Sequence, residues 1–236
     1  MTAKELLEAG KVREAEMLVT AHLRNNPGDI AQRTFLFELL CFSGQFARAE
    51  KQLGVLAQGS KEAEMGAVLY YSALHGEKTR HEMFRKQEYP TTPAPKSPPG
   101  TLNGKPFESI ADADPIIGAR LEMYAAGAYL WIPFEHIASV ELPAPRSLRD
   151  TLWAPAFVLT GPSFKGTDIG QVILPAIYPF SWKSDDGSVW MGRKTEWAGD
   201  DQGNEFPVGQ KTLIVDGEEI PLLEIRSLEF TSSAAA

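Results

Sequence analysis

The sequence has little cysteine and no long apolar run. Its 236 residues include one cysteine, Cys41, so no disulfide can form within the chain and a reducing compartment is indicated. Cys41 lies between Leu40 and Phe42, which favours a buried structural thiol over a reactive one. No apolar stretch is long enough to span a bilayer, and no secretory signal follows Met1. We therefore expect a soluble, cytoplasmic protein.

Histidine is also scarce, and the four histidines are scattered at positions 22, 75, 81 and 136. No pair of them has metal-ligand spacing, and no glycine-rich loop has a phosphate-binding pattern. Ser163 lies between glycines in Gly161-Pro-Ser-Phe-Lys-Gly166, but the spacing differs from that of a nucleophile motif and predicts a hairpin loop. We expect no metal, no cofactor and no catalytic residue.

Basic residues are outnumbered, with 23 Lys and Arg against 31 Asp and Glu. Residues 1–89 hold 12 of each sign, whereas residues 90–236 carry the whole net charge of −8 and all five tryptophans. Phosphate binding needs a basic surface, so we expect neither nucleic acid nor an anionic membrane as the main partner. The change in composition predicts two domains.

A repeat is present near the N-terminus. Gly10 and Gly44 are 34 residues apart, as are Ala15 and Ala49, and this spacing is the period of a tetratricopeptide repeat (TPR). The glycine permits a tight turn between antiparallel helices, and the alanine permits close packing. The repeat predicts a TPR-like α-helical domain over residues 1–88, a type of fold that binds other proteins more often than it performs chemistry.

Helical periodicity and capping residues place six helices in this domain. Asp29 and Ser60 are predicted N-caps. Gly76 is predicted to end the fifth helix and so to separate it from the sixth. The expected helices are 2–9, 11–25, 29–43, 45–58, 60–75 and 77–88.

The sequence pattern changes after the helical domain. Six prolines between residues 89 and 106 predict a semi-extended linker. A further helix is expected at about 107–126, with Asp114 as N-cap and Pro115 in its first turn. After Gly127, short strand patterns with Gly and Pro turns follow, including a hairpin at Asp216–Gly217. We predict an α+β chain in which residues 107–230 form a helix plus a small antiparallel, barrel-like β domain, followed by a flexible tail over 231–236.

Six residues are candidate contacts for a partner protein. Glu38 lies on the apolar helix 29–43, where an unpaired charge is costly, so we expect an ion pair with Arg33 or Arg48, or a contact to a partner. Arg193 and Trp197 combine two residue types that often anchor interfaces; alternatively, they lock the sheet to the linker or to the helical domain. The six candidates are Arg33, Glu38, Trp131, Trp153, Arg193 and Trp197.

Ordered sequence blocks cover nearly the whole chain. They are Arg33-Thr-Phe-Leu-Phe-Glu-Leu-Leu-Cys-Phe-Ser-Gly44 with Arg48-Ala-Glu-Lys-Gln-Leu53, Trp131-Ile-Pro-Phe-Glu135, Leu148-Arg-Asp-Thr-Leu-Trp153, Leu174-Pro-Ala-Ile-Tyr-Pro179 with Ser181, Gly192-Arg-Lys-Thr-Glu-Trp197, and Leu222-Leu-Glu-Ile225. In this order they resemble the ImpE family, also called SciE or TagJ, whose members are accessory proteins of the bacterial type VI secretion apparatus.

The resemblance implies a non-enzymatic adaptor that binds the N-terminal helix of the small subunit of the contractile sheath. It supplies no catalytic residues. Two alternatives stay open. One is a structural scaffold that self-associates as a homo-oligomer and takes no peptide ligand. The other is a hydrolase that uses the acidic turns Asp185–Gly187 and Asp200–Asn204 of the β domain.

Overall fold

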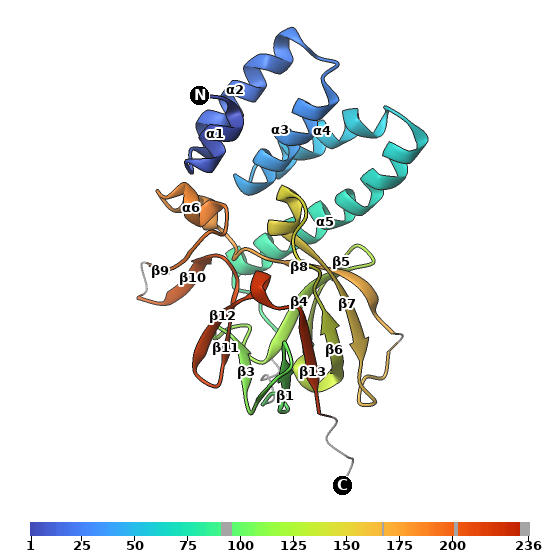
Figure 1. Cartoon of the computed structure of the whole chain (residues 1–236), viewed down its shortest axis with the longest axis vertical. Coiled ribbons are helices and arrows are strands. Elements are labelled where there is room, and N and C mark those ends of the chain that lie inside the picture. The colour runs from blue at the N-terminus through green and yellow to red at the C-terminus, as the bar shows by residue number, and fades with distance from the viewer. Residues whose placement is uncertain (91–95, 167, 201–202, 232–236) are drawn as a thin grey trace.

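A computed structural model describes residues 1–90, 96–166, 168–200 and 203–231. The chain has an N-terminal helical part and a C-terminal part built from antiparallel strands, and these lie at opposite ends of the molecule (Figure 1). The predicted α+β class is therefore confirmed. The expected tail over 231–236 lies outside the described residues, apart from Thr231, and so do residues 91–95 of the expected linker.

Five helices form the first part. Asp29 and Ser60 accept hydrogen bonds from backbone amides three residues on, so both predicted N-caps are confirmed. Gly10 and Gly44 adopt φ values of +75° and +68° at the turns, a conformation that suits glycine. The helices are α1 (Ala3–Glu8), α2 (Val12–Asn25), α3 (Ile30–Phe42), α4 (Phe46–Ala57) and α5 (Lys61–Lys86).

The predicted break at Gly76 is wrong. Helix α5 runs without interruption for 26 residues, so the expected helices 60–75 and 77–88 are one element. A Cβ atom at Gly76 would lie only 2.5 Å from the ring of Tyr124. The glycine therefore permits close packing of α5 against the sheet, and it does not terminate the helix.

The predicted helix at 107–126 is also wrong. The segment contains the end of β2 (Lys105–Phe107), then β3 (Ile110–Asp112) and β4 (Arg120–Ala125). Asp114 accepts a hydrogen bond from the amide of Ile116 in the turn between β3 and β4, a local arrangement that competes with helix formation. Strand β1 (Gly100–Leu102) and most of β2 also lie inside the expected linker.

The strands form three sheets. The largest has eight strands in the order β2-β1-β13-β6-β7-β8-β4-β5, and it does not close on itself within the described residues. The smaller sheets have the orders β12-β11-β3 and β10-β9. The barrel-like detail of the prediction is therefore not confirmed. The remaining strands are β5 (Ala128–Pro133), β6 (Ile137–Glu141), β7 (Trp153–Thr160), β8 (Gly170–Pro175), β9 (Thr195–Gly199), β10 (Glu205–Gly209), β11 (Thr212–Val215), β12 (Glu218–Pro221) and β13 (Ser227–Phe230).

Local turn chemistry explains the hairpins. Asp216 and Gly217 join β11 to β12 with φ values of +49° and +91°, as a tight hairpin turn with two left-handed residues requires. The Gly161–Gly166 loop follows β7 and precedes β8. Both predicted turns are confirmed.

The helical part and the sheet part share one of the two hydrophobic clusters. That cluster joins residues of all five helices to Trp153, Ile173 and Trp190 of the second part. The short elements η2 (Leu148–Thr151) and α6 (Gly187–Trp190) lie between the helices and the sheet (Figure 1). Within the described residues, no helix combines the length and apolar composition needed to cross a membrane.

Candidate functional site

The first candidate site is an open groove on the helical part, which we call groove 1. It has a volume of about 710 Å³ and is bounded by α1, α2, α3, η2 and the turn after α6. Apolar side chains supply most of its wall, and charged or polar groups lie among them. The wall includes Leu7, Leu18, Val19, Phe35, Leu148 and Met191, with Lys4, Glu8, His22, Gln32, Glu38 and Arg193 beside them.

Glu38 is a nearly buried carboxylate of this groove. Its Oε1 lies 3.1 Å from Nε of Arg149, which comes from η2. The Arg149 guanidinium also lies 4.5 Å from the ring centroid of Tyr70, a cation–π contact. Burial raises the pKa of Glu38, and the charge of Arg149 opposes this effect. Groove 1 therefore holds a carboxylate–guanidinium pair beside its apolar wall.

The predicted ion-pair partners of Glu38 are wrong. Arg33 donates hydrogen bonds to Gln52 and to the backbone carbonyl of Pro27, at 2.7 and 2.6 Å. Arg48 pairs instead with Glu16. The observed partner, Arg149, belongs to a distant part of the sequence, so reasoning along the helices could not find it.

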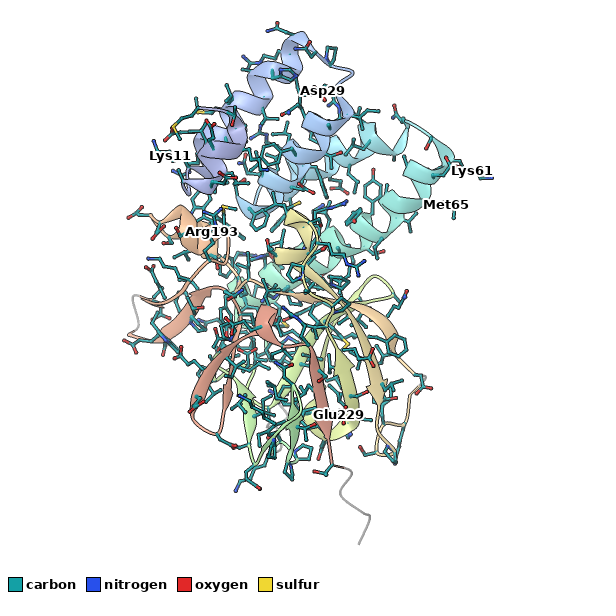
Figure 2. The ribbon with its side chains drawn as sticks, viewed as in Figure 1. Lys11, Asp29, Lys61, Met65, Arg193 and Glu229 are labelled. Atoms are coloured by element: carbon teal, nitrogen blue, oxygen red, sulfur yellow. The ribbon has the colours of Figure 1, made fainter. Side chains whose placement is uncertain are left out.

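Arg193 also lines groove 1, and it joins the two parts of the chain. Its guanidinium donates hydrogen bonds to the carbonyl oxygens of Leu7 and Glu8, at 3.1 and 2.6 Å. Figure 2 shows this side chain just below α1. These bonds satisfy carbonyls at the C-terminal end of the short helix α1; that of Leu7 also accepts from the amide of Gly10 at 3.0 Å. Trp197, by contrast, is half exposed on β9 and does not line the groove.

The two other predicted tryptophans lie where the helices meet the sheet. Trp153 is buried, and its indole nitrogen donates to Oε2 of Glu77 on α5 at 3.0 Å. Trp131 on β5 is half-buried and stacks on Tyr89. Groove 1 thus gathers Glu38 and Arg193 of the six candidates, and Arg33, Trp131, Trp153 and Trp197 lie elsewhere.

A cluster of buried charges joins α5 to the sheet, and we call it the junction cluster. It consists of Glu77 and Arg80 of α5, Glu122 of β4, Asp112 of β3 and Lys211, which precedes β11. All five residues are buried. Nε and Nη2 of Arg80 donate to the two carboxylate oxygens of Glu122 at 2.9 and 3.1 Å.

The remaining members complete this network. Lys211 contacts Glu122 and lies 2.6 Å from Asp112, and Arg80 also donates to the carbonyl oxygen of Ile177 at 2.9 Å. Charges in a protein interior are tolerated only when they are paired and hydrogen-bonded. The cluster therefore joins the two parts through three carboxylates that share two basic groups.

The pKa values of the two glutamates in the junction cluster reflect this pairing, whereas burial raises the pKa of Asp112 to about 6. Burial alone would raise the pKa of Glu122, but Arg80 and Lys211 lower it to about 2. Burial also opposes ionisation of Glu77, yet hydrogen bonding to His81 and the charge of Arg80 lower its pKa to about 2. Both groups are ionised at neutral pH. Sequence reasoning missed this cluster, although Glu122 stands out as a charge between Leu121 and Met123.

One serine–histidine pair resembles a catalytic pair. Oγ of Ser163, in the loop after β7, lies 2.9 Å from Nδ1 of His136, which directly precedes β6. However, the hydroxyl donates to the carbonyl oxygen of Glu135 at 2.8 Å, and the hydrogen bonds of this pair lie at the exposed surface. A nucleophilic serine needs its proton directed at the base, so this arrangement is that of a loop-stabilising contact.

The carboxylates of the predicted acidic turns contact residues that are close to them in sequence. Asp186 caps α6 by accepting from the amide of Ser188 at 2.7 Å, and it also pairs with Lys194. Asp200 accepts from the backbone and side chain of Asn204; residues 201–202 of this turn lie outside the described residues. Asp186 and Asp200 therefore stabilise turns.

Comparison with known proteins agrees with the sequence blocks. The family model for ImpE protein matches residues 104–229. The chain is 31% identical over 272 aligned positions to the type VI secretion system accessory component TagJ of Pseudomonas aeruginosa, an alignment that covers 100% of this chain and 93% of that protein.

A solved structure shares the fold. The crystal structure of VPA1032 from Vibrio parahaemolyticus superposes with a TM-score of 0.83 at 21% identity, and the match covers 97% of each chain. The sequence match and the common fold extend over both the helical and the sheet part. The chain belongs to the ImpE family.

Proposed function

We propose that this chain is a cytoplasmic, non-enzymatic accessory protein of a type VI secretion apparatus. In this role it binds a helix of a contractile-sheath component, the N-terminal helix of the small sheath subunit. The relationship to TagJ, named an accessory component of this system, supports the pathway. The proposal includes a TPR-like arrangement of the helices. Paired helices with glycine turns at a 34-residue spacing are typical of peptide-binding repeats.

Groove 1 is the observation that carries the proposal. Three helices bound a groove of about 710 Å³ with a largely apolar wall, and amphipathic helices bind in such grooves through their apolar face. Leu18 of α2 is 41% exposed within it, so its apolar surface is available to a ligand.

Calorimetric titration with a synthetic peptide of that N-terminal sheath helix tests the proposal. We expect binding in the micromolar range or tighter, and at least a tenfold loss of affinity for Leu18→Asp, because the new charge must be desolvated in the groove. Met17→Asp is the matched control, since Met17 is exposed on the same helix and does not line groove 1. Absence of binding up to high micromolar peptide, or equal losses for both variants, contradicts the proposal.

A further inference from the structure

A second groove, groove 2, lies between the N-terminal half of α5 and the outer face of β7 and β8. Its volume is about 600 Å³. Met65, Val68 and Leu69 form one wall, and Phe157 and Ile173 lie on the other. Figure 2 shows Met65 near the end of α5 that is farther from the sheet. Groove 2 shares no lining residue with groove 1.

The wall on α5 is an exposed apolar stripe. Met65, Val68 and Leu69 are 69%, 61% and 53% exposed, and Phe157 of β7 is 41% exposed. The three helix residues have the spacing i, i+3 and i+4, so they share one face. Contiguous exposed apolar side chains commonly mark a surface that another molecule covers.

The geometry of groove 2 favours a helical ligand. A stripe of side chains at i, i+3 and i+4 forms a ridge that packs against the side chains of a second helix. The outer face of β7 supplies a second wall, on which Phe157 points away from the core. A helix lying along α5 would contact both walls, as in other cases of helix-in-groove recognition.

The charges around groove 2 select between possible ligands. Glu141 lines the groove, and Glu62 and Glu64 lie on the first turn of α5 beside Met65, with Lys61 as the basic residue of that turn. A two-fold dimer through this face would bring the carboxylates of both copies to one apolar interface, and such juxtaposition of like charges is unfavourable. A ligand with basic residues beside its apolar face avoids this cost.

We propose that groove 2 is a second docking surface, which binds an amphipathic helix of another protein with an apolar face flanked by lysine or arginine. This surface is independent of groove 1. A protein with two such grooves can hold two partner segments at once, which gives an adaptor its bridging capacity.

Two fluorescently labelled model peptides test this proposal by anisotropy with the full-length protein. Both are 14-residue helices with leucine on one face; the other positions are lysine in one peptide and glutamate in the second. We expect the leucine–lysine helix to bind at micromolar concentration and the leucine–glutamate helix to bind at least tenfold more weakly.

Two valine variants separate the groove from general charge attraction. Val68→Asp should weaken binding of the leucine–lysine helix at least tenfold, whereas Val55→Asp should leave it unchanged. Val55 is 47% exposed on α4 and lies outside groove 2. Both variants add one negative charge, so non-specific attraction would strengthen binding in both.

Several outcomes overturn the proposal. Equal binding of the two peptides, or no binding of either up to 500 µM (about 4.5 kcal/mol of binding free energy), excludes a basic helical ligand. Equal effects of Val68→Asp and Val55→Asp exclude groove 2 as the site. A dimer of the wild-type protein in sedimentation equilibrium that Val68→Asp dissociates assigns the surface to self-association instead.

Discussion

The two halves of α5 differ in what they bury and what they expose. The inner half, residues 73–86, buries the charged Glu77 and Arg80 against the sheet. The outer half, residues 61–72, exposes Met65, Val68 and Leu69. Burial along α5 therefore follows the position of the sheet, because the inner half contacts β4 and β5 and the outer half extends beyond them (Figure 1).

This difference assigns the two halves different tasks. The inner half holds the two parts together through charges that are paired within the chain. The outer half carries apolar surface that the fold itself leaves uncovered. A helix can thus connect the two parts of a protein at one end and offer a binding face at the other.

Removing the charge of Arg80 should have the largest effect on stability. Arg80→Met leaves Glu122 and Glu77 without their main cation, and breaking a buried ion pair in this way costs about 3–5 kcal/mol in the free energy of unfolding. Urea denaturation measures the loss. Arg85→Met is the control on the same helix, because the Arg85–Glu82 pair is exposed to solvent and should contribute little to stability. Similar losses in both variants would show that the junction cluster has no special role.

Low pH should also reduce the stability that the inner half of α5 provides. The folded-state pKa values of Glu77 and Glu122 are about 2, below the ordinary value of 4.5. Their stabilising contribution is therefore present above pH 4.5 and is lost as the pH falls from 4.5 to 2. In this range unfolding takes up two protons. The free energy of unfolding should therefore fall by about 2–3 kcal/mol for each unit by which the pH is lowered. Urea denaturation at a series of pH values measures this slope, and a flat profile below pH 4.5 would contradict the assignment.

Alanine substitutions at two glycines of α5 compare the stability effects of the two halves directly. Gly76→Ala should destabilise the protein by about 1–3 kcal/mol, because the new methyl group meets the ring of Tyr124 at 2.5 Å. Gly66→Ala, in the outer half, has no neighbour within 4 Å of the new Cβ. It should stabilise the helix by about 0.5–1 kcal/mol. Thermal unfolding of both variants gives the signs, and the same sign in both would remove the distinction between the halves.

Local signals in the sequence were enough to predict the first four helices. Asp29 and the turns at Gly10 and Gly44 define their ends through short-range hydrogen bonds and backbone conformation, which do not depend on the rest of the fold. The Asp216–Gly217 hairpin was predictable for the same reason. The family blocks identified the family, although they did not reveal where each residue lies.

Long-range contacts account for most of the errors. Residues 110–112 and 120–125 form strands because β3 pairs with β11 and β4 pairs with β5 and β8. Such pairing outweighs the helical signal of Asp114 and Pro115, which lie in the turn between β3 and β4. Gly76 lies within the continuous helix α5, and its lack of a side chain leaves room for the ring of Tyr124, which is distant in sequence. Division into separate domains over 1–88 and 107–230 stays a prediction.

The candidate site was predictable only in part. Glu38 was identified from its position on an apolar helix, yet its partner Arg149 and the groove around it depend on η2. Arg193 was identified from composition, and its bonds to α1 support the alternative in which it locks the two parts together. Groove 2 was not predicted, since Met65 and Leu69 have the periodicity of core residues.

Native-state hydrogen exchange along α5 tests the contrast between its halves most directly. Amides of the inner half should exchange only through global unfolding, whereas amides of the outer half should exchange at least a hundredfold faster through local opening. Addition of the leucine–lysine helix should slow exchange in the outer half and leave the inner half unchanged. Uniform protection along α5 in the free protein, or a response confined to the inner half, would contradict this account.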